Sequence, residues 1–506
     1  MRGTKPMKKL AFSAALIFAL AACAAPGGKK NYALFVPDPG EVATSEAQRN
    51  SPKPLEISFG IDLKREMPKL RPLHGVTNYV PVGHAGAPYK YGMREALREL
   101  ELPYSYYHDD SVTNLGKSVI DVSRIFPLFH ADENDPRNYL FQETDAYLKM
   151  AVADGVKIIY RLGETIETGG TSFRTLPPED YAKWTRICLN IVRHYNEGWA
   201  NGFHWNIQDW AVWEEPNNPN LWHGDFDEYL KLYKIFAPEF KKAFPRLRVG
   251  GPQTTTLGYP YLEKFLKFVR DEKLPLDFVA YTAYYLTPAE LLAESVKRRQ
   301  LLDKYGFGDV PLWTNEWHCS PYWYDYNDPV SFDRELKRFG GTEGAVFAAT
   351  VLCGAQDSPL ERACFYSACL IHGWGMFDTD GRPSPTYYVF KKFSPFYRNS
   401  VRRVAVDVRG ASANTQALAS LNRDGEIEFL CGVFSPNEGE LALNIPEGFR
   451  PRLIQALDDT TTPYFVEMPG HRVSDDGKTL TLHKLKCASA FYVVFHPVGP
   501  KAEGTK

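Results

Sequence analysis

Short apolar runs alternate with amphipathic runs between residues 73 and 398, and this alternation restricts the possible folds more than any other feature of the chain. The apolar runs are typical of buried strands, and the amphipathic runs are typical of helices that cover them. Strict alternation of strand and helix predicts a parallel sheet, because each helix returns the chain to the same end of the sheet. Eight such units predict a closed (β/α)8 barrel.

The expected elements of this barrel can be placed along the chain. The expected strands are Leu73–Asn78, Tyr104–His108, Val156–Leu162, Trp210–Trp213, Arg248–Gly251, Leu276–Tyr284, Val310–Trp317 and Arg362–Cys369. The expected helices are Tyr91–Leu102, Phe141–Asp154, Pro177–Tyr195, Phe226–Phe244, Tyr259–Asp271, Pro288–Tyr305, Gly341–Ala355 and a last one that begins with Thr386–Phe393. A doubly wound sheet would need a phosphate fingerprint such as G-x-G-x-x-G after the first strand, and Tyr79–Gly86 does not supply it.

After residue 398 the pattern changes to short alternating strands. Turn sequences such as Asn422–Gly425 and Asp475–Gly477 separate them. We therefore expect a β-sandwich over residues 399–498 and a disordered tail over residues 499–506. The run Leu55–Asp62 is a candidate extra strand of the sandwich, so residues 56–72 are assigned to an N-terminal strand. The predicted fold class is α/β: a (β/α)8 TIM barrel over residues 73–398 with an appended C-terminal β-sandwich.

The N-terminus has the pattern of a targeting segment. Four basic residues precede the apolar run Leu10–Ala22, which is too short to span a bilayer comfortably. The next residue is Cys23, and Leu20-Ala21-Ala22-Cys23 resembles the bacterial lipobox. We therefore expect a lipoprotein signal peptide over residues 1–23, lipid on Cys23, and a flexible tether over residues 24–55. The protein would then be anchored in the bacterial cell envelope, periplasmic or at the cell surface; a plain signal peptide is the alternative.

The charge balance argues against one class of partner. The chain has 59 Lys and Arg against 61 Asp and Glu, a formal net charge of −2, which gives no general attraction to nucleic acid. Aromatic residues make up 14% of the chain. These rings suit either a surface that stacks on sugars or a tyrosine-rich core, so composition leaves the partner open.

Two glutamates lie where the fourth and seventh expected strands end. Glu215 lies in the run Trp213–Asn217, and Glu316 lies in the run Asn315–Trp317. In a (β/α)8 barrel, functional residues gather at the carboxyl ends of the strands. Two carboxyl groups across the barrel mouth are what glycoside hydrolysis needs, one as a protonated acid and one as a nucleophile or stabiliser. A glutamate flanked by tryptophan can stay protonated near neutral pH because it is poorly solvated.

These motifs resemble those of clan A retaining glycoside hydrolases, most closely glycoside hydrolase family 39, the β-xylosidase and α-L-iduronidase family. The family's W-N-E-P-N followed by L and W is similar to Trp213–Asn217 with Leu221 and Trp222, and its V-G-G-P is similar to Val249–Pro252. Its T-E-W/F is similar to Asn315–Trp317. The end of its barrel is similar to Phe377–Pro383 followed by Tyr387 and Tyr388. The resemblance implies that Glu215 is the general acid/base and Glu316 the nucleophile of a retaining hydrolase. It implies no metal and no organic cofactor.

Three departures from the family pattern affect the expected sugar site. Glu214 stands where the family has an asparagine that hydrogen-bonds the sugar 2-hydroxyl. Glu214 could accept the same bond, could prefer a cationic or unusual 2-substituent, or could point away as a structural carboxylate. Of the family's R-x-H motif only the histidine, His108, is present. It is expected either to contact the sugar or to support a residue that does. Arg161 is a candidate replacement for the missing arginine. The family's H-x-Y keeps only Tyr284, which would hydrogen-bond Glu316.

Further candidate substrate contacts are Trp374, Trp317 and Asn217, although each tryptophan could equally be packing. The predicted function is a retaining glycoside hydrolase that cleaves an oligosaccharide or polysaccharide. Two alternatives remain open at this point. One is a surface glycan-binding lipoprotein with a catalytically altered barrel, and the other is a transglycosylase on the same barrel.

Overall fold

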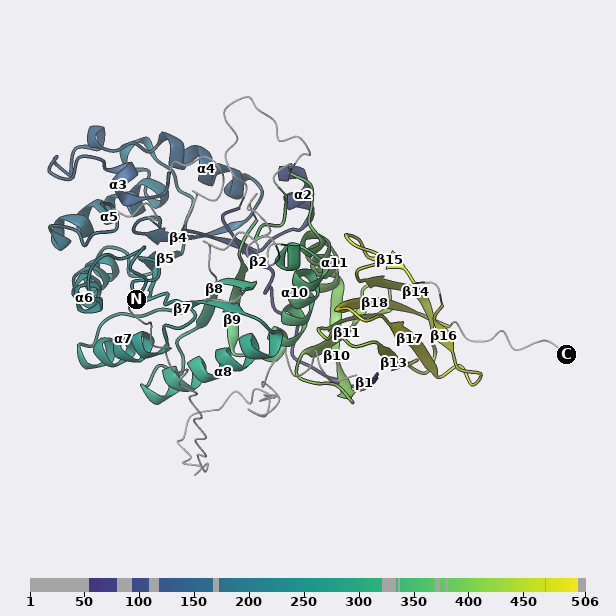
Figure 1. The fold of residues 1–506 in the computed structure, drawn as a ribbon. Helices are drawn as coiled ribbons and strands as arrows, with labels where there is room; N and C mark the ends of the chain where they lie inside the picture. Colours follow the sequence, from purple (N-terminus) through teal and green to yellow (C-terminus); the bar gives the residue numbers. More distant parts are fainter. Residues whose placement is uncertain are drawn as a thin grey trace, which may run out of the picture. The chain divides into compact units, whose positions relative to one another are not determined.

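The computed structural model describes residues 54–79, 93–108, 118–166, 173–320, 334, 337–368, 374–378, 381–468 and 470–498. The chain forms an eight-stranded parallel sheet and a second sheet of ten strands (Figure 1). The predicted lipidation site Cys23, nearly all of the predicted tether and the predicted tail lie outside the described residues. Within the described ranges, no helix combines the length and the apolar character that crossing a membrane requires.

The eight parallel strands form a barrel. They are β2 (Gly75–Thr77), β3 (Tyr104–Tyr107), β4 (Lys157–Leu162), β5 (Asp209–Val212), β6 (Arg248–Gly250), β7 (Val279–Tyr285), β8 (Leu312–Cys319) and β9 (Leu360–Phe365). Their order is β6-β5-β4-β3-β2-β9-β8-β7. Isolated bridges from Gly250 to Phe278 and from Thr254 to Tyr281 join the two end strands. The predicted (β/α)8 barrel is therefore confirmed.

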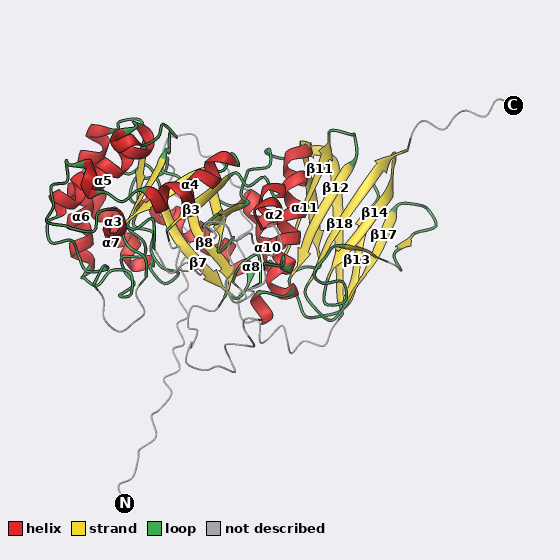
Figure 2. Ribbon diagram, turned by 90° about the horizontal axis from the view of Figure 1, so that it is seen from above, coloured by secondary structure: helices red, strands yellow, loops and turns green. Residues whose placement is uncertain are grey.

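Helices follow the strands and cover the outside of the barrel (Figure 2). They are α2 (Met93–Glu99), α3 (Val122–Ile125), α4 (Gln142–Ala153), α5 (Tyr181–Asn196), α6 (Phe226–Ala243), α7 (Tyr259–Asp271), α8 (Pro288–Lys304), α10 (Thr342–Gly354) and α11 (Pro385–Asn399). Capping boxes start α6, between Asp225 and Glu228, and α8, between Thr287 and Glu290. Each box satisfies backbone N–H groups that the first turn leaves open, which fixes where the loops after β5 and β7 end.

Several element boundaries differ from the expectation. The last barrel strand ends at Phe365 instead of Cys369, because the backbone N–H of Ser367 turns to bond the carbonyl of Trp374 at 3.0 Å. The last helix, expected to begin with Thr386–Phe393, begins at Pro385 and runs to Asn399 with Pro395 inside it. Proline interrupts the helix pattern in a sequence, but burial of one face of α11 keeps the helix intact around it.

The lower interior of the barrel is filled by apolar side chains. Phe278 and Trp313 stack with ring centroids 3.9 Å apart, and Tyr104, Tyr106 and other small and aromatic side chains complete this cluster. Gly250 lies against it, because a Cβ at this position would meet the Phe278 ring at 2.4 Å and its carbonyl oxygen at 2.5 Å. The close approach of β6 to Phe278 therefore depends on glycine.

The second sheet consists of β1 and the C-terminal strands, and it folds over an apolar core of its own. These strands are β1 (Leu55–Glu66), β10 (Ser400–Arg409), β11 (Thr415–Asn422), β12 (Ile427–Val433), β13 (Gly439–Asn444), β14 (Phe449–Leu457), β15 (Val466–Glu467), β16 (Arg472–Val473), β17 (Thr479–Lys484) and β18 (Ser489–Pro497). β1 lies between β10 and β13. Phe59 of β1 meets Phe429 of β12 edge to face at 5.3 Å, although two strands separate them in the sheet. The sheet therefore packs against itself, as the predicted sandwich requires.

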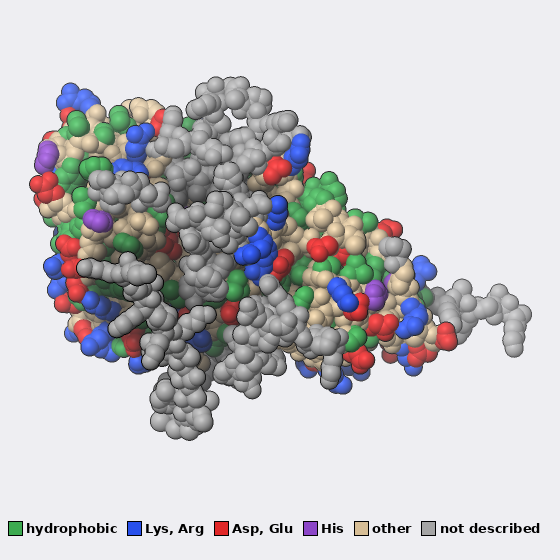
Figure 3. All heavy atoms as spheres, viewed as in Figure 1, with side chains coloured by type: hydrophobic (Ala, Val, Ile, Leu, Met, Phe, Trp, Pro, Cys, Tyr) green, Lys and Arg blue, Asp and Glu red, His purple; other side chains and the backbone are tan. Residues whose placement is uncertain are grey.

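Helices α10 and α11 form part of the contact between the barrel and the C-terminal sheet (Figure 2). The thiol of Cys353 on α10 lies 3.6 Å from the carbonyl of Leu430 on β12, and Arg403 of β10 forms a two-pronged ion pair with Asp357. Buried apolar residues from both sides belong to one cluster. On the face that Figure 3 draws, acidic and basic side chains are interspersed, in line with the near-zero net charge.

Adding one methyl group at the barrel seam tests the closure. We expect Gly250→Ala to lower the free energy of unfolding by about 1–3 kcal/mol, because the new Cβ overlaps Phe278. Urea and thermal unfolding followed by circular dichroism measure this. Gly60→Ala on β1 is the control and should change stability by less than about 0.5 kcal/mol, since its Cβ would meet only ordinary contacts, at 3.6 Å. Equal stability of the two variants would contradict the close contact between β6 at Gly250 and Phe278.

Candidate active site

Three buried glutamates lie at the carboxyl ends of β5 and β8. Glu214 is 1% exposed, Glu215 is 8% exposed and Glu316 is 6% exposed. Glu214 and Glu215 follow the last residues of β5, and Glu316 lies near the end of β8. This is the end of a (β/α)8 barrel at which functional residues gather.

The backbone after β5 bends twice to place its two glutamates. Trp213 and Glu215 both have left-handed backbone conformations, with φ angles of 64° and 38°. Gln253, in the neighbouring loop, stabilises the bend with two hydrogen bonds. Its side-chain amide donates to the backbone carbonyl of Trp213 at 2.9 Å, and its backbone carbonyl accepts from the Glu215 N–H at 3.0 Å. Such backbone outliers cost energy and persist only where the surroundings impose them, which is common at functional sites.

A β-bulge on β8 turns a second residue into the site. Tyr281 of β7 pairs with Thr314, and the next residue, Thr282, pairs with Glu316, so Asn315 is the extra residue. In a regular strand, adjacent side chains point to opposite faces. Here Asn315 donates its side-chain amide to Glu214 Oε1 at 2.7 Å, while Glu316 contacts Tyr284. Bulges of this kind re-aim side chains beside active sites.

Glu316 has two polar neighbours, Tyr284 and His108. The Tyr284 hydroxyl donates to Oε2, the contact that the family resemblance implies. His108 Nε2 lies 3.0 Å from Oε1 but is not aligned for a hydrogen bond. Burial, with the nearby Arg161 cation, lowers the pKa of His108 well below its usual value, so the ring is neutral. His108 also stacks on Tyr106, with centroids 5.0 Å apart. The Tyr284 bond and the His108 contact together orient the Glu316 carboxyl group.

Glu215 lies in a different environment. Burial raises its pKa, and the side chains of Asn218 and Thr282 oppose part of that rise. The Asn218 amide donates to Glu215 Oε2 at 2.9 Å. The net direction favours the protonated form, which is the form that a general acid needs. Thr282 is also the register partner of Glu316, so Glu215 reaches across to the strand beside β8.

Glu214 points towards Glu316 and His108 and not away from them. Its oxygens accept hydrogen bonds from the Tyr106 hydroxyl and from Asn315. Burial and the negative charge of Glu215 raise the pKa of Glu214 well above its usual value. This side chain therefore lies in the same buried cluster as the predicted catalytic pair.

Arg161 does not take the place of the family's missing arginine. It is fully buried and forms an ion pair with Asp121 at 2.8 Å, and it also donates to the backbone carbonyl of His108. Asp121 is shared with Arg174 at 2.6 Å. The guanidinium therefore supports the backbone of His108 and does not contact Glu316 directly in any of its hydrogen bonds or ion pairs among the described residues.

The described residues include one set of potential metal ligands. Donor atoms of His108, Glu214 and Glu316 all lie within 4.8 Å of one another. Tyr106, Asn315 and Tyr284 already donate to these two carboxylates. That donor set suits carboxylates held by hydrogen bonds, and the chemistry proposed below requires no metal from it.

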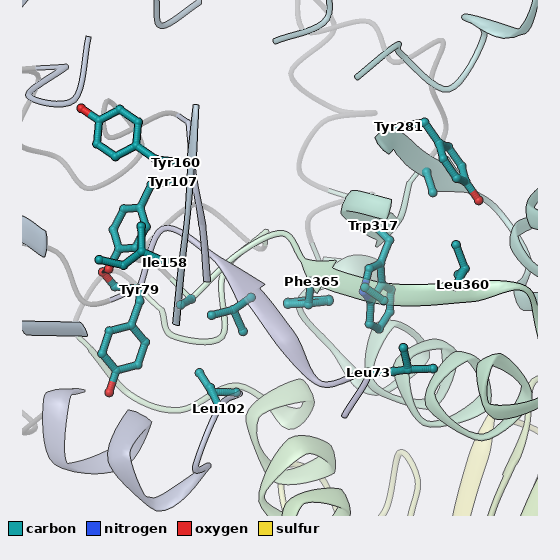
Figure 4. Close-up of a cluster of buried hydrophobic side chains, with 14 of the residues drawn as sticks. Leu73, Tyr79, Leu102, Tyr107, Ile158, Tyr160, Tyr281, Trp317, Leu360 and Phe365 are labelled. Atoms are coloured by element: carbon teal, nitrogen blue, oxygen red, sulfur yellow. Dashed lines mark hydrogen bonds between the residues drawn. The ribbon is translucent and has the colours of Figure 1, made fainter. Parts of the chain in front are cut away.

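The other predicted contacts divide between the site and the core. Trp374 is largely buried and meets Tyr284 edge to face at 5.3 Å, so it lies beside the cluster. Trp317 is fully buried and packs on Phe365 (Figure 4), and it also packs on Phe390 of α11. Its position is one of packing and is not at the cluster. This follows from the strand alternation, which turns Trp317 outwards once Glu316 faces inwards.

Asn217 is also used for structure. Its amide donates to the Thr255 hydroxyl at 2.7 Å, and its carbonyl oxygen accepts from the Thr255 N–H at 3.1 Å. These bonds tie the loop after β5 to the loop after β6. Asn217 therefore positions the loop that carries Glu215 and makes none of its hydrogen bonds to the three glutamates.

Four residues that the sequence analysis did not assign a role complete the site. They are Tyr106, Asn218, Gln253 and Asn315. Alternation along β3 could have indicated Tyr106, since it lies two residues before His108 on the same face. The spacing of three residues between Glu215 and Asn218 fits a turn. Asn315 and Gln253 had no such signal, because a bulge and a long-range loop contact bring them in.

Comparison with known proteins agrees with this geometry. Residues 120–333 match the model of the family described as Glycosyl hydrolases family 39. The chain resembles glycoside hydrolase family 39. A β-xylosidase of Geobacillus stearothermophilus is 26% identical over 289 residues, which are 51% of this chain and 55% of that protein. A β-xylosidase of Caldicellulosiruptor saccharolyticus is 26% identical over 275 residues, 49% of this chain and 51% of that protein. The chain thus spans about half the length of the curated relatives it matches.

Solved structures share the architecture. A glucosidase from Croceicoccus marinus superposes with a TM-score of 0.67 at 21% identity, covering 88% of this chain and 100% of that one. The family 39 enzyme from Xanthomonas axonopodis pv. citri gives 0.61 at 18% identity, covering 89% and 99%. A monomeric β-xylosidase from Caulobacter crescentus gives 0.60 at 16% identity, covering 87% and 100%. At these identities the likeness concerns the fold, a barrel with a β-sandwich.

The buried ion pair behind His108 is open to a stability test. We expect Asp121→Asn to lower the free energy of unfolding by about 3–5 kcal/mol, because it leaves the buried Arg161 charge without its counter-ion. Denaturant unfolding measures the loss. Asp407→Asn, which removes the pair with Arg65 whose two side chains are each 51% exposed, should cost less than about 1 kcal/mol. Similar losses of unfolding free energy in both variants would show that the buried Asp121 pair stabilises the fold no more than the exposed Asp407 pair does.

Proposed function

We propose that this chain is a retaining glycosidase, with Glu215 as the general acid/base and Glu316 as the nucleophile. The observation that carries the proposal is the contrast between their surroundings. Glu316 accepts a hydrogen bond from Tyr284 and lies 3.0 Å from the neutral His108 ring, while burial favours the protonated form of Glu215. One oriented carboxyl group and one that tends to hold a proton are what acid-assisted nucleophilic cleavage of a glycoside needs.

The reaction would proceed in two steps. In the first, Glu316 attacks the anomeric carbon while Glu215 gives its proton to the departing glycosidic oxygen, which leaves a covalent glycosyl–enzyme ester. In the second, Glu215 takes a proton from a water molecule, whose oxygen attacks the anomeric carbon and displaces Glu316. Two inversions return the sugar with its original configuration. The Tyr284 hydroxyl holds the Glu316 carboxylate in place for both attacks, and the His108 ring lies against it.

We propose a β-xyloside or a related β-glycoside as the substrate. The curated relatives carry the name β-xylosidase, and one similar structure is that of a glucosidase. Trp374, beside Tyr284, is the aromatic side chain best placed to pack against a sugar ring. The lipobox-like end of the signal segment supports a location in the bacterial cell envelope, anchored through lipid on Cys23.

Removing either carboxyl group should strongly reduce turnover, and the products formed with azide should distinguish the two variants. We expect Glu215→Ala and Glu316→Ala each to reduce kcat/KM for an aryl β-xyloside by a factor of about 100 to 10,000 or more. Azide should restore activity by replacing the lost carboxylate. It should give a β-glycosyl azide with Glu215→Ala and an α-glycosyl azide with Glu316→Ala, which NMR distinguishes.

Glu428→Ala is the matched control, because Glu428 is a buried glutamate of the C-terminal sheet. It should keep near-normal kcat/KM per folded molecule. Wild-type activity in either active-site variant would defeat the assigned roles. NMR of the first-formed sugar from the wild-type protein tests the stereochemistry, and an inverted anomer would defeat the retaining mechanism.

The alkaline limb of the pH profile reports on the proposed acid. Activity should fall as the pH rises through the pKa of Glu215, because the acid then loses its proton. Asn218 opposes the rise of that pKa by donating to the carboxylate. Asn218→Ala should therefore move the alkaline limb of kcat/KM to higher pH. Asn217→Ala, which removes bonds to Thr255 only, should leave the limb where it is. A shift to lower pH in Asn218→Ala would contradict the role of Glu215.

A further inference from the structure

Three polar atoms converge at the base of the site. A ring nitrogen of His108 and one carboxylate oxygen each of Glu214 and Glu316 lie within 4.8 Å of one another, and all three side chains are buried. Three points no more than 4.8 Å apart share a position within about 2.8 Å of each, which is hydrogen-bond distance. A single small polar group there could contact all three residues.

Two of the three residues present acceptors to that position. His108 Nε2 lies 3.0 Å from Glu316 Oε1 without forming a hydrogen bond to it. Glu214 is fixed by donors on both oxygens, Tyr106 on Oε2 and Asn315 on Oε1. These bonds keep the Glu214 carboxyl group from rotating out of the cluster. A ligand group between Glu214 and Glu316 therefore meets two carboxyl groups that can each accept a hydrogen bond.

The protein places no cation directly on Glu214. No lysine or arginine of the described ranges forms an ion pair with it. Arg161 is the cation that acts on Glu214 at longer range, and it is bound to Asp121 at 2.8 Å. A buried carboxylate is unfavourable unless an opposite charge or strong donors meet it. Burial and the charge of Glu215 accordingly raise the pKa of Glu214, so without a ligand this carboxyl group holds a proton, and a cationic group of the ligand would take the place of that proton.

We propose that Glu214 makes this site select glycosides with a protonated primary amine on the ring carbon next to the anomeric carbon. The inference rests on the proposed function, because that function puts the anomeric carbon at Glu316. A group between Glu316 and Glu214 is then a substituent of the neighbouring ring carbon. A hydroxyl is neutral, so it leaves the proton on Glu214 and gains no charge pair there. An ammonium group has three N–H donors and a positive charge, so it serves both.

An acylated amine does not meet these conditions. It has a single N–H and no charge, and its acyl group would have to fit beside a side chain that is 1% exposed. The proposal therefore separates free amino sugars from both their hydroxyl and their acetamido counterparts.

A pair of non-hydrolysable ligands tests the selection. The ligands are phenyl 1-thio-β-xyloside and its 2-amino-2-deoxy counterpart, titrated by calorimetry into the full chain at a pH at which the amine is protonated. We expect the amine to bind about tenfold or more tighter than the hydroxyl compound, as for a charge-assisted bond. In Glu214→Gln, which keeps the shape but cannot become a carboxylate, the ratio should fall to about one or below. Glu214→Asn is a second variant with the same expected loss of preference.

Glu428→Gln is a closely matched control. Glu428 is also buried and accepts bonds from a tyrosine and an asparagine, Tyr492 and Asn422, each at 2.7 Å, but it lies in the C-terminal sheet. This variant should keep the wild-type preference. No amine preference in the wild-type protein, no measurable binding of either ligand, or the same preference after Glu214→Gln would overturn the proposal.

Hydrolysis of the matching aryl O-xylosides separates this inference from the proposed function. Turnover without a Glu214-dependent amine preference would leave the glycosidase in place and overturn the inference. A Glu214-dependent preference in binding without turnover of either O-xyloside would support the amine site and count against the glycosidase.

Discussion

The burial of three glutamates at one end of the barrel is the constraint on which the site depends. A carboxylate removed from water is costly unless donors or cations meet it. Here each carboxyl group has a hydrogen-bond donor of its own: Glu214 has Tyr106 and Asn315, Glu215 has Asn218, and Glu316 has Tyr284. These donors come from β3, β7, β8 and the loop after β5. The arrangement therefore exists only when the barrel is closed.

Irregular backbone makes this set of contacts possible. Left-handed conformations at Trp213 and Glu215 send two adjacent glutamates to different partners, and the bulge at Asn315 turns two adjacent side chains of β8 inwards. A regular strand would have turned one residue of each pair away. Inside the barrel, Phe278 and Trp313 stack on each other and Gly250 packs against Phe278, so the regular part of the barrel that supports these irregular strand ends is closely packed. Regular and irregular parts thus have separate roles, one to close the barrel and one to aim the carboxyl groups.

Much of this could be predicted from local patterns. Alternating strands and helices indicate the barrel, and the two glutamate motifs indicate where its site lies, because strand ends meet at one rim in this fold. The sequence left Trp317 open between a sugar contact and a packing residue, and the side chain packs against α11. It also offered Arg161 as support for the nucleophile, but Asp121 holds that guanidinium. Both cases depend on which face a side chain takes, and a bulge or a buried partner decides that.

The sequence by itself determined the fold class, the rim on which the chemistry lies and the two glutamates with their resemblance to family 39. These follow from periodicity and from short motifs, which are local properties of the chain. Only the tertiary structure decided that Glu214 faces Glu316 and His108, and that Tyr106, Asn218, Gln253 and Asn315 complete the site. The physical reason is that hydrogen bonds between residues as much as 108 positions apart form only after the strands are in register, and no local pattern encodes that register.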